Sequence, residues 1–474
     1  MIQRLNRLIA SLAVLALPLL LRAQTSQNPT PSDLSAILER LDRLERENRA
    51  LTDEVRELRA KLDRMAESAP SAPSIPSAAP APPVEPTTSA SPPEPSTAEK
   101  LEVLDHRVEE QAQTKVEASQ KFPIRLAGIA LFNAFLNSRQ SDGVEYPTTA
   151  QPTGPRSAGA TIRQTIIGLE YHGPATFLGG SVHGSVFMDF FPPVAQATIP
   201  GQTIRLRTGS IEIDWKHTSI MVGQEKPIFN PREPSSLAQL GVSPFTGAGN
   251  LWLWLPQVRV EQDVPFGGST GLRAQLGVVQ TRELGPYTGT PFNGVFEPVR
   301  PGYEGRFEFF HNFDDERRIE IAPGFHVSQT HANGSSIPSR VISTDWLLRS
   351  HWLELTGAFF TGKNIAPLGS GYQQGFGFYS WHLAAVASIG GWAQLTVHAT
   401  RRLDFHLFSG QQDDNNMDLN EGRIGKNLLY GGNLYYRLAP NVLLSLETTQ
   451  LRTLYLGQGV RINNHYDVAL GYFF

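Results

Sequence analysis

Residues 123–474 follow a pattern that few folds can accommodate, because short segments alternate between apolar and polar side chains. Glu212 and Asp214, for example, alternate with Ile211 and Ile213. Successive side chains of a strand point to opposite faces, so each segment predicts a strand with one apolar and one polar face. Repeated over segments of about ten residues, this pattern is typical of a transmembrane β-barrel.

The gaps between these segments alternate between short and long. The longer gaps are 138–160, 191–203, 226–250, 284–301, 330–338, 361–371, 404–425 and 456–462, and the short gaps are 172–176, 216–217, 264–269, 313–316, 349–351, 388–391 and 439–441. Outer-membrane barrels have short periplasmic turns and longer outer loops. The sequence therefore predicts an all-β fold, an antiparallel barrel of about 16 strands with both ends on the periplasmic side.

No apolar stretch after the first 23 residues is as long as a transmembrane helix. A closed barrel is then the way for this chain to cross lipid, because every backbone N–H and C=O group must be paired there. The alternative is a soluble β-protein, but its last strand would expose an aromatic edge that favours aggregation. Tyr472 and Phe474 instead resemble the C-terminal signal that the barrel-assembly machinery of Gram-negative bacteria recognises.

Residues 1–23 have the composition of a signal peptide. Arg4 and Arg7 precede an apolar run at 9–21, which is shorter than a membrane anchor needs. We therefore expect export and cleavage, and a location in the bacterial outer membrane.

Residues 24–67 contain a heptad repeat, with apolar a and d positions from Leu34 to Met65 that only Asn48 interrupts. Such a repeat predicts a left-handed coiled coil in the periplasm, and a buried Asn at an a position commonly fixes register. The alternative is a single amphipathic helix lying on another domain, which usually has a wider apolar face. Residues 68–121 then form a Pro-rich linker with a short helix, and the barrel occupies 122–474.

Composition excludes several classes of function. The net charge of −4 is too small for a nucleic-acid binder, and a chain without cysteine has no disulfide or thiolate metal site. The sequence contains no Gly-x-Ser-x-Gly elbow, His-Glu-x-x-His helix or phosphate-binding glycine loop. We therefore expect no enzyme, no catalytic residues, no cofactor and no metal.

Four segments carry a resemblance to a known family: FPIRLAGIALFNAF at 122–135, IRQTIIGLEYHGP at 162–174, VHGSVFMDFF at 182–191 and IEIDWKHTSIMVGQEKPIF at 211–229. Together with the heptad helix and the Pro-rich spacer, they make the chain resemble the DcaP-like trimeric porins. The resemblance implies a homotrimer in which each barrel is a channel for small anionic solutes such as dicarboxylates. The barrel segment departs from a strongly basic pore, because its charges are nearly balanced.

Selectivity in a channel comes from the groups at its narrowest point. In sixteen-stranded porins the third outer loop forms that constriction, which here is 226–250. Its candidate residues are Lys226, Phe229, Arg232, Glu233, Gln239 and Phe245. The alternative is a loop that covers the mouth, with its charges solvated.

A porin also needs basic residues on the wall that faces the loop. Candidates on polar strand faces are Arg163, Arg205, Arg207, Arg259, Arg273 and Arg306. An arginine facing lipid at mid-depth would cost about 2–4 kcal/mol, so we expect this group in the lumen. Each could instead pair with a neighbouring carboxylate as part of the wall.

Trp252 and Trp254 have two interpretations. They fit an aromatic belt at the membrane interface, or a stacking track for sugars as in maltoporin-like channels.

The function expected from the sequence is passive diffusion of small hydrophilic solutes. The alternatives are a sugar-specific channel and a structural tether, in which the coiled coil binds peptidoglycan or a partner and the barrel only anchors it.

Overall fold

The structure is a computed structural model, and it describes residues 124–191, 204–283, 295–296, 300–332, 335–370, 372, 374–379 and 382–474. The predicted signal peptide, the coiled coil with Asn48 and the Pro-rich linker lie outside the described residues. Within the described ranges, no helix is both long and apolar enough to cross a membrane.

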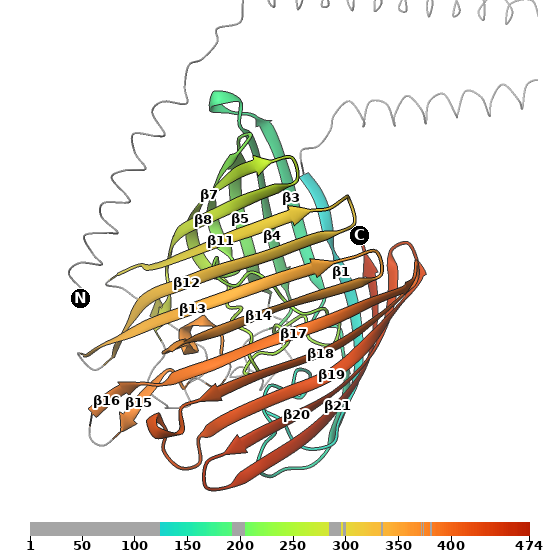
Figure 1. The fold of residues 1–474 in the computed structure, drawn as a ribbon. Coiled ribbons are helices and arrows are strands. Elements are labelled where there is room, and N and C mark those ends of the chain that lie inside the picture. Colours follow the sequence, from blue (N-terminus) through green and yellow to red (C-terminus); the bar gives the residue numbers. More distant parts are fainter. Residues whose placement is uncertain are drawn as a thin grey trace, which may run out of the picture. The chain divides into compact units, whose positions relative to one another are not determined.

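Sixteen antiparallel strand positions close into one barrel, as the sequence predicts (Figure 1). The strands are β1 (Ile124–Asn137), β3 (Ile166–Ala175), β4 (Ser181–Asp189), β5 (Arg205–Asp214), β6 (Thr218–Glu225), β7 (Leu255–Gly267), β8 (Thr270–Val279), β11 (Gly302–Asn312), β12 (Arg318–Ala332), β13 (Ser335–Arg349), β14 (Leu353–Lys363), β17 (Ala387–Thr400), β18 (Leu403–Asp414), β19 (Ile424–Ala439), β20 (Val442–Tyr455) and β21 (Gly459–Phe473). Each pairs with its predecessor in this order, and β21 pairs with β1 to close the sheet.

Shorter elements lie beside these strands. The segment β2 (Ser157–Thr161) pairs with the second half of β1, and β3 pairs with the first half, so the two share one strand position. The hairpins β9 (Arg282–Glu283) with β10 (Val295–Phe296) and β15 (Phe376–Tyr379) with β16 (His382–Ala385) lie between barrel strands along the chain. Three 3-10 turns complete the described elements: η1 (Phe177–Gly179), η3 (Ala366–Leu368) and η4 (Asn416–Asp418).

The alternation read from the sequence separates the two faces of the sheet. In β21, the apolar side chains of Tyr466, Val468 and Leu470 are exposed on the outer surface, whereas His465 and Asp467 are buried inside the barrel. The apolar face therefore points outward and the polar face inward, which is the arrangement that a barrel in lipid requires.

The two ends of the barrel sheet meet at one seam. The backbone N–H of Gly128 donates to the carbonyl of Phe474 at 3.0 Å, and the N–H of Phe474 donates to the carbonyl of Gly128 at 3.2 Å. The rings of Tyr472 and Phe474 stack with their centroids 6.3 Å apart. The predicted assembly signal, Tyr472 and Phe474, thus lies where β21 closes the barrel. Its recognition by the barrel-assembly machinery stays a prediction.

Some of the predicted gaps are wrong. Strands β12 and β13 occupy most of 330–338, and the turn predicted at 388–391 is absent. Strand β17 runs straight through residues 388–391, and β18 occupies the first half of the loop predicted at 404–425. The glycine pair Gly390–Gly391 has another cause, because a Cβ on Gly391 would lie 2.6 Å from the carbonyl oxygen of Ala358. On the other side of this wall, a Cβ on Gly249 would lie 2.2 Å from the carbonyl oxygen of Gly391. These glycines allow close backbone approach within a strand rather than forming a turn.

Candidate functional site

The loop between β6 and β7, residues 226–254, lies inside the barrel and crosses its lumen. We call it the third loop. It receives hydrogen bonds from inward-facing side chains of well-separated strands: Ser343 Oγ of β13 donates to the Phe229 carbonyl at 2.8 Å, and Asn433 Nδ2 of β19 donates to the Ser235 carbonyl at 2.9 Å. On β1, Asn133 Nδ2 donates to the Leu237 carbonyl at 2.8 Å. A segment bound to these three strands must pass from one side of the barrel to the other.

One amide side chain makes three hydrogen bonds to the tip of the third loop. Gln164 lies in the break between β2 and β3 and is completely buried. Its Nε2 donates to the Ala238 carbonyl at 2.8 Å, and its Oε1 accepts from the N–H groups of Leu240 and Gly241, both at 2.7 Å. Gln164 thereby satisfies three backbone groups of a segment with no strand partner. Sequence reasoning missed this role, because an inward-facing Gln carries no signal for what it meets.

The six predicted constriction residues all belong to this loop, but they differ in what they contact. Phe229 packs beside His326, and Phe245 packs against Trp392 and Phe408 of the wall. Lys226 Nζ lies 2.6 Å from a carboxylate oxygen of Glu233, so these two charges pair within the loop. Arg232 reaches the wall, and Gln239 Nε2 donates at 3.4 Å to the carbonyl of Pro147, which lies in the loop after β1, residues 138–156, the first loop.

Two of the predicted wall arginines bind one carboxylate, and a third lies beside them. Arg205 binds Asp189 with two hydrogen bonds, at 3.0 and 2.5 Å, and Arg207 Nη1 binds the same carboxylate at 2.7 Å. Arg163 lies nearby and pairs with Glu145 at 3.0 Å. We call these five residues the Asp189 cluster.

Groups without charge supply the remaining contacts of the Asp189 cluster. Arg207 donates to the Leu240 carbonyl at 2.7 Å, and Arg205 donates to the Gly241 carbonyl, so both hold the third loop. Arg163 also lies over the ring of Phe191, at 4.9 Å from its centroid.

Trp254 lies under the same arginines, which overturns the membrane-belt interpretation. Trp252 and Trp254 are only 5% and 6% exposed and lie in the apolar cluster inside the barrel, not at the lipid surface. The guanidinium groups of Arg207 and Arg205 lie 4.6 and 5.2 Å from the ring centroid of Trp254. The buried rings also leave no open face for a sugar-stacking track. The direction of these two side chains could not be predicted from the sequence, because Leu and Trp alternate there and both faces of a strand would be apolar.

Tyr146 of the first loop lies at the edge of this cluster. Its ring meets Phe191 edge-on, with centroids 4.8 Å apart. Burial raises the pKa of the Tyr146 hydroxyl, and the nearby charges of Asp142 and Glu145 raise it further. The hydroxyl therefore stays neutral and adds no negative charge beside the arginines.

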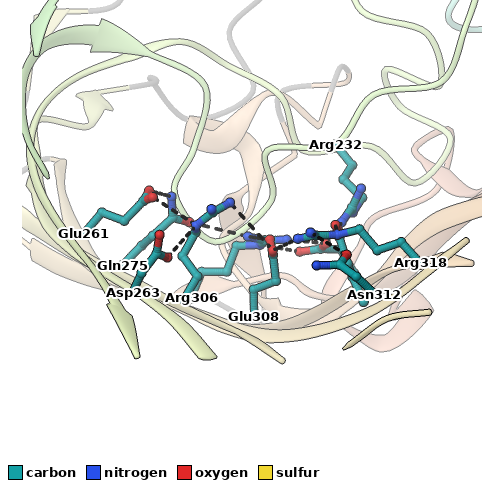
Figure 2. Close-up of polar contacts among 11 residues, drawn as sticks. Arg232, Glu261, Asp263, Gln275, Arg306, Glu308, Asn312 and Arg318 are labelled. Atoms are coloured by element: carbon teal, nitrogen blue, oxygen red, sulfur yellow. Dashed lines mark hydrogen bonds and ion pairs between the residues drawn. The ribbon is translucent and has the colours of Figure 1, made fainter. Parts of the chain in front are cut away.

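A second group of charges lies on β7, β8 and β11 to β13, and Figure 2 shows most of it. Arg306 binds Asp345 through two hydrogen bonds, at 2.7 and 2.8 Å, and Glu308 through a third at 2.7 Å. Arg232 points from the third loop to this wall, where its Nε donates to Asp345 at 2.5 Å (Figure 2). The Asp345 cluster, as we call it, consists of Arg232, Arg273, Arg306, Arg318, Glu261, Asp263, Glu308, Glu320 and Asp345.

The two clusters differ in charge balance. The Asp189 cluster has three arginines and two carboxylates, a formal charge of +1. The Asp345 cluster has four arginines and five carboxylates, a formal charge of −1. Arg259, the remaining predicted wall residue, belongs to neither and lies 3.7 Å from Glu212.

The start of the third loop rests on a buried chain of three side chains. His326 Nδ1 lies 2.8 Å from Glu304, and its Nε2 lies 2.7 Å from Ser328 Oγ. The other oxygen of Glu304 accepts from the N–H of Ile228 at 2.7 Å. The order of an acid, a histidine and a serine resembles a hydrolase triad, but all three are buried beneath the loop. They support the loop and offer no substrate access.

No metal site accompanies these charges in the described part of the chain, where no group of three or more His, Cys, Asp or Glu side chains could hold an ion.

Comparison with known proteins finds relatives by structure alone. No protein-family model matches the sequence, and no curated protein sequence is significantly similar to it. The outer membrane channel DcaP of Acinetobacter baumannii has a TM-score of 0.61 and 14% identity, covering 74% of this chain and 97% of that chain. An anion-selective porin from Comamonas acidovorans has a TM-score of 0.49 and 12% identity, covering 74% and 99%. OmpT of Vibrio cholerae has a TM-score of 0.44 and 8% identity, covering 74% and 97%. The likeness to DcaP confirms the resemblance seen in the sequence at the level of the fold.

Proposed function

We propose that this chain is a porin of the bacterial outer membrane, a passive diffusion channel for small hydrophilic solutes. The observation that carries the proposal is the third loop, which crosses the lumen and is bound to wall residues on several sides. A barrel that served only as an anchor would have no need of a loop held inside it by so many polar contacts. The apolar outer face and the fold shared with DcaP support the membrane location.

We further propose that the third loop and the Asp189 cluster form the constriction, and that it prefers anionic, dicarboxylate-like solutes. Carbonyl groups and aromatic faces stabilise the cations of this cluster without cancelling their charge. Arg163 suits a role toward solutes, because its side chain is one-third exposed and Glu145 is its one ion-pair partner among the described residues. A positive field beside a narrow passage concentrates anions.

Planar-bilayer recording tests both parts of the proposal. The full-length protein should give steady conductance, and its reversal potential in a KCl gradient should have the sign of chloride preference. Arg163→Gln should shift that potential toward cation preference, because it removes a charge at the constriction. Arg125→Gln is the matched control, since Arg125 is exposed near the start of β1 and pairs with Glu170 only at 3.9 Å.

The outcomes of that recording distinguish a channel from a tether and test whether the Asp189 cluster belongs to the constriction. Absence of steady conductance would favour the structural tether. Retention of residues 24–67 in the cell-wall fraction would then identify peptidoglycan as the partner of the coiled coil. Equal shifts for Arg163→Gln and Arg125→Gln would remove the Asp189 cluster from the constriction. The sugar-specific alternative has no supporting contact, because Trp252 and Trp254 are buried.

We also propose that the protein is a homotrimer whose residues 24–67 form a periplasmic coiled coil, with Asn48 fixing its register. The support is the heptad repeat from Leu34 to Met65. Deletion of residues 24–98 should convert the trimer to monomers, as measured by native mass spectrometry in detergent. A trimer of undiminished stability after deletion would show that the barrel walls suffice.

A further inference from the structure

The outer surface of the barrel has very few charged side chains. In the strands whose side chains are described, alternation places five Asp, Glu, Lys or Arg residues outward: Arg340, Lys363, Asp413, Lys426 and Arg452. Four are cations and one is a carboxylate, and each lies in the half of its strand toward the long loops. The outer surface at this end is therefore positive.

Lys426 and Arg452 already have partners within the barrel. Lys426 Nζ lies 2.9 Å from a carboxylate oxygen of Asp413. Arg452 donates to Gln450 at 2.7 Å and to the Tyr430 hydroxyl at 3.0 Å. These contacts account for both cations without an external ligand.

Arg340 and Lys363 have no such explanation. They are direct cross-strand partners on β13 and β14, and both are exposed. Their outward direction follows from Ser339 and Val341, which flank Arg340 and are buried inside the barrel. No carboxylate of the described residues lies within ion-pair distance of either cation. Like charges directly opposite each other destabilise a sheet, so an anion bound between the two cations would stabilise this part of the sheet.

The surroundings of the pair indicate what that anion is attached to. Ile342, two residues along β13, is 67% exposed on the outer surface, and Phe359 on β14 and Val327 on β12 are also exposed there. Val327 is the register partner of Arg340 on β12. The two cations therefore stand at the border between an apolar surface and the polar loop end, which is the depth of lipid headgroups.

We propose that Arg340 and Lys363 bind the phosphate group of an anionic membrane lipid, whose acyl chain lies against Ile342 and Phe359. A guanidinium can bind two phosphate oxygens at once, and the ammonium adds a second positive charge. The phosphate reduces the repulsion between the two cations. The apolar surface below them excludes water from the acyl chain of the lipid. This inference rests on the membrane location of the proposed function but not on channel activity.

Native mass spectrometry of the full chain in a nonionic detergent tests the site, with dioleoylphosphatidic acid as probe and dioleoylphosphatidylcholine as the zwitterionic comparison. The double variant Arg340→Gln with Lys363→Gln should weaken phosphatidic acid binding by roughly thirtyfold, given the usual attraction of an anionic lipid to each cation. The control is Arg401→Gln with Arg402→Gln. It removes the same charge from the exposed turn between β17 and β18, at the opposite end of the barrel, and should change binding by less than about twofold.

Three results would overturn the site: equal binding of the two lipids to the unaltered protein, unchanged affinity in the Arg340 and Lys363 variant, or the same loss in the control. A changed oligomeric mass with unchanged lipid binding would instead assign this surface to a second copy of the chain. Conductance of the same preparations separates the lipid site from the channel function. Steady current from a protein that does not bind phosphatidic acid would refute the lipid site and leave the channel function standing.

Discussion

The Asp189 and Asp345 clusters both place arginines on the inner wall of the barrel, yet the guanidinium groups have different kinds of partner in each. In the Asp345 cluster nearly every guanidinium contact is with a carboxylate, so the carboxylates outweigh the positive charge of the arginines. In the Asp189 cluster, backbone carbonyls of the third loop and the rings of Phe191 and Trp254 take the place of further carboxylates. These partners hold a cation in place and leave its charge available to the lumen.

This difference separates wall structure from a candidate selectivity element. The Asp345 cluster pairs its guanidinium groups mainly with carboxylates and has a formal charge of −1, whereas the Asp189 cluster has a formal charge of +1 and a positive field that anions can sense. Counting arginines on polar faces, as the sequence permits, does not distinguish the two.

The largest expected effect concerns the Asp345 cluster. Asp345 is fully buried and accepts from both Arg306 and Arg232. We expect Asp345→Asn to lower the free energy of unfolding by about 3–5 kcal/mol, because two guanidinium groups would lose their shared carboxylate in a buried site. Equilibrium unfolding in lipid vesicles, followed by tryptophan fluorescence, measures the change.

Asp413→Asn is the matched control for that substitution. Asp413 pairs with Lys426 on the partly exposed outer surface, so its loss should cost less than about 1 kcal/mol. If both variants lost the same stability, the Asp345 cluster would not be the structural network that its contacts indicate.

A smaller effect concerns Trp254, which lies under two arginines of the Asp189 cluster. Trp252 and Trp254 are almost equally buried, but among the described residues only Trp254 has guanidinium groups over its ring. Replacing either by Leu removes aromatic surface, and Trp254→Leu should cost about 0.5–2 kcal/mol more than Trp252→Leu because cation–π contacts are also lost. The same unfolding measurement compares them, and equal losses would mean that Trp254 contributes packing alone.

Much of the fold was predictable from the sequence because its cause is local. The alternation of Tyr466, Val468 and Leu470 with His465 and Asp467 sets which face of β21 points to lipid, whatever its neighbours are. The number of strands and the position of the third loop followed from the same alternation and from the lengths of the gaps. The cost of an arginine in lipid likewise placed the six wall arginines inward as a group.

The partners inside the lumen were not predictable, and the glycine pair shows why. Gly390–Gly391 has the composition of a turn, but a side chain at Gly390 would meet the ring of Phe360 and one at Gly391 the carbonyl of Ala358, both on the neighbouring strand. Gln164, Trp254 and the Glu304–His326–Ser328 chain raise the same difficulty, since each acts on a segment far away in the sequence.

The sequence by itself determined that this chain closes into a barrel with an apolar outside and a polar inside, because alternation and turn length act between near neighbours. Only the tertiary structure decided which charges meet, as with Arg232 and Asp345, which are 113 residues apart and bond at 2.5 Å. Closing the barrel fixes the distances across its lumen, and those distances determine which side chains can form hydrogen bonds and ion pairs.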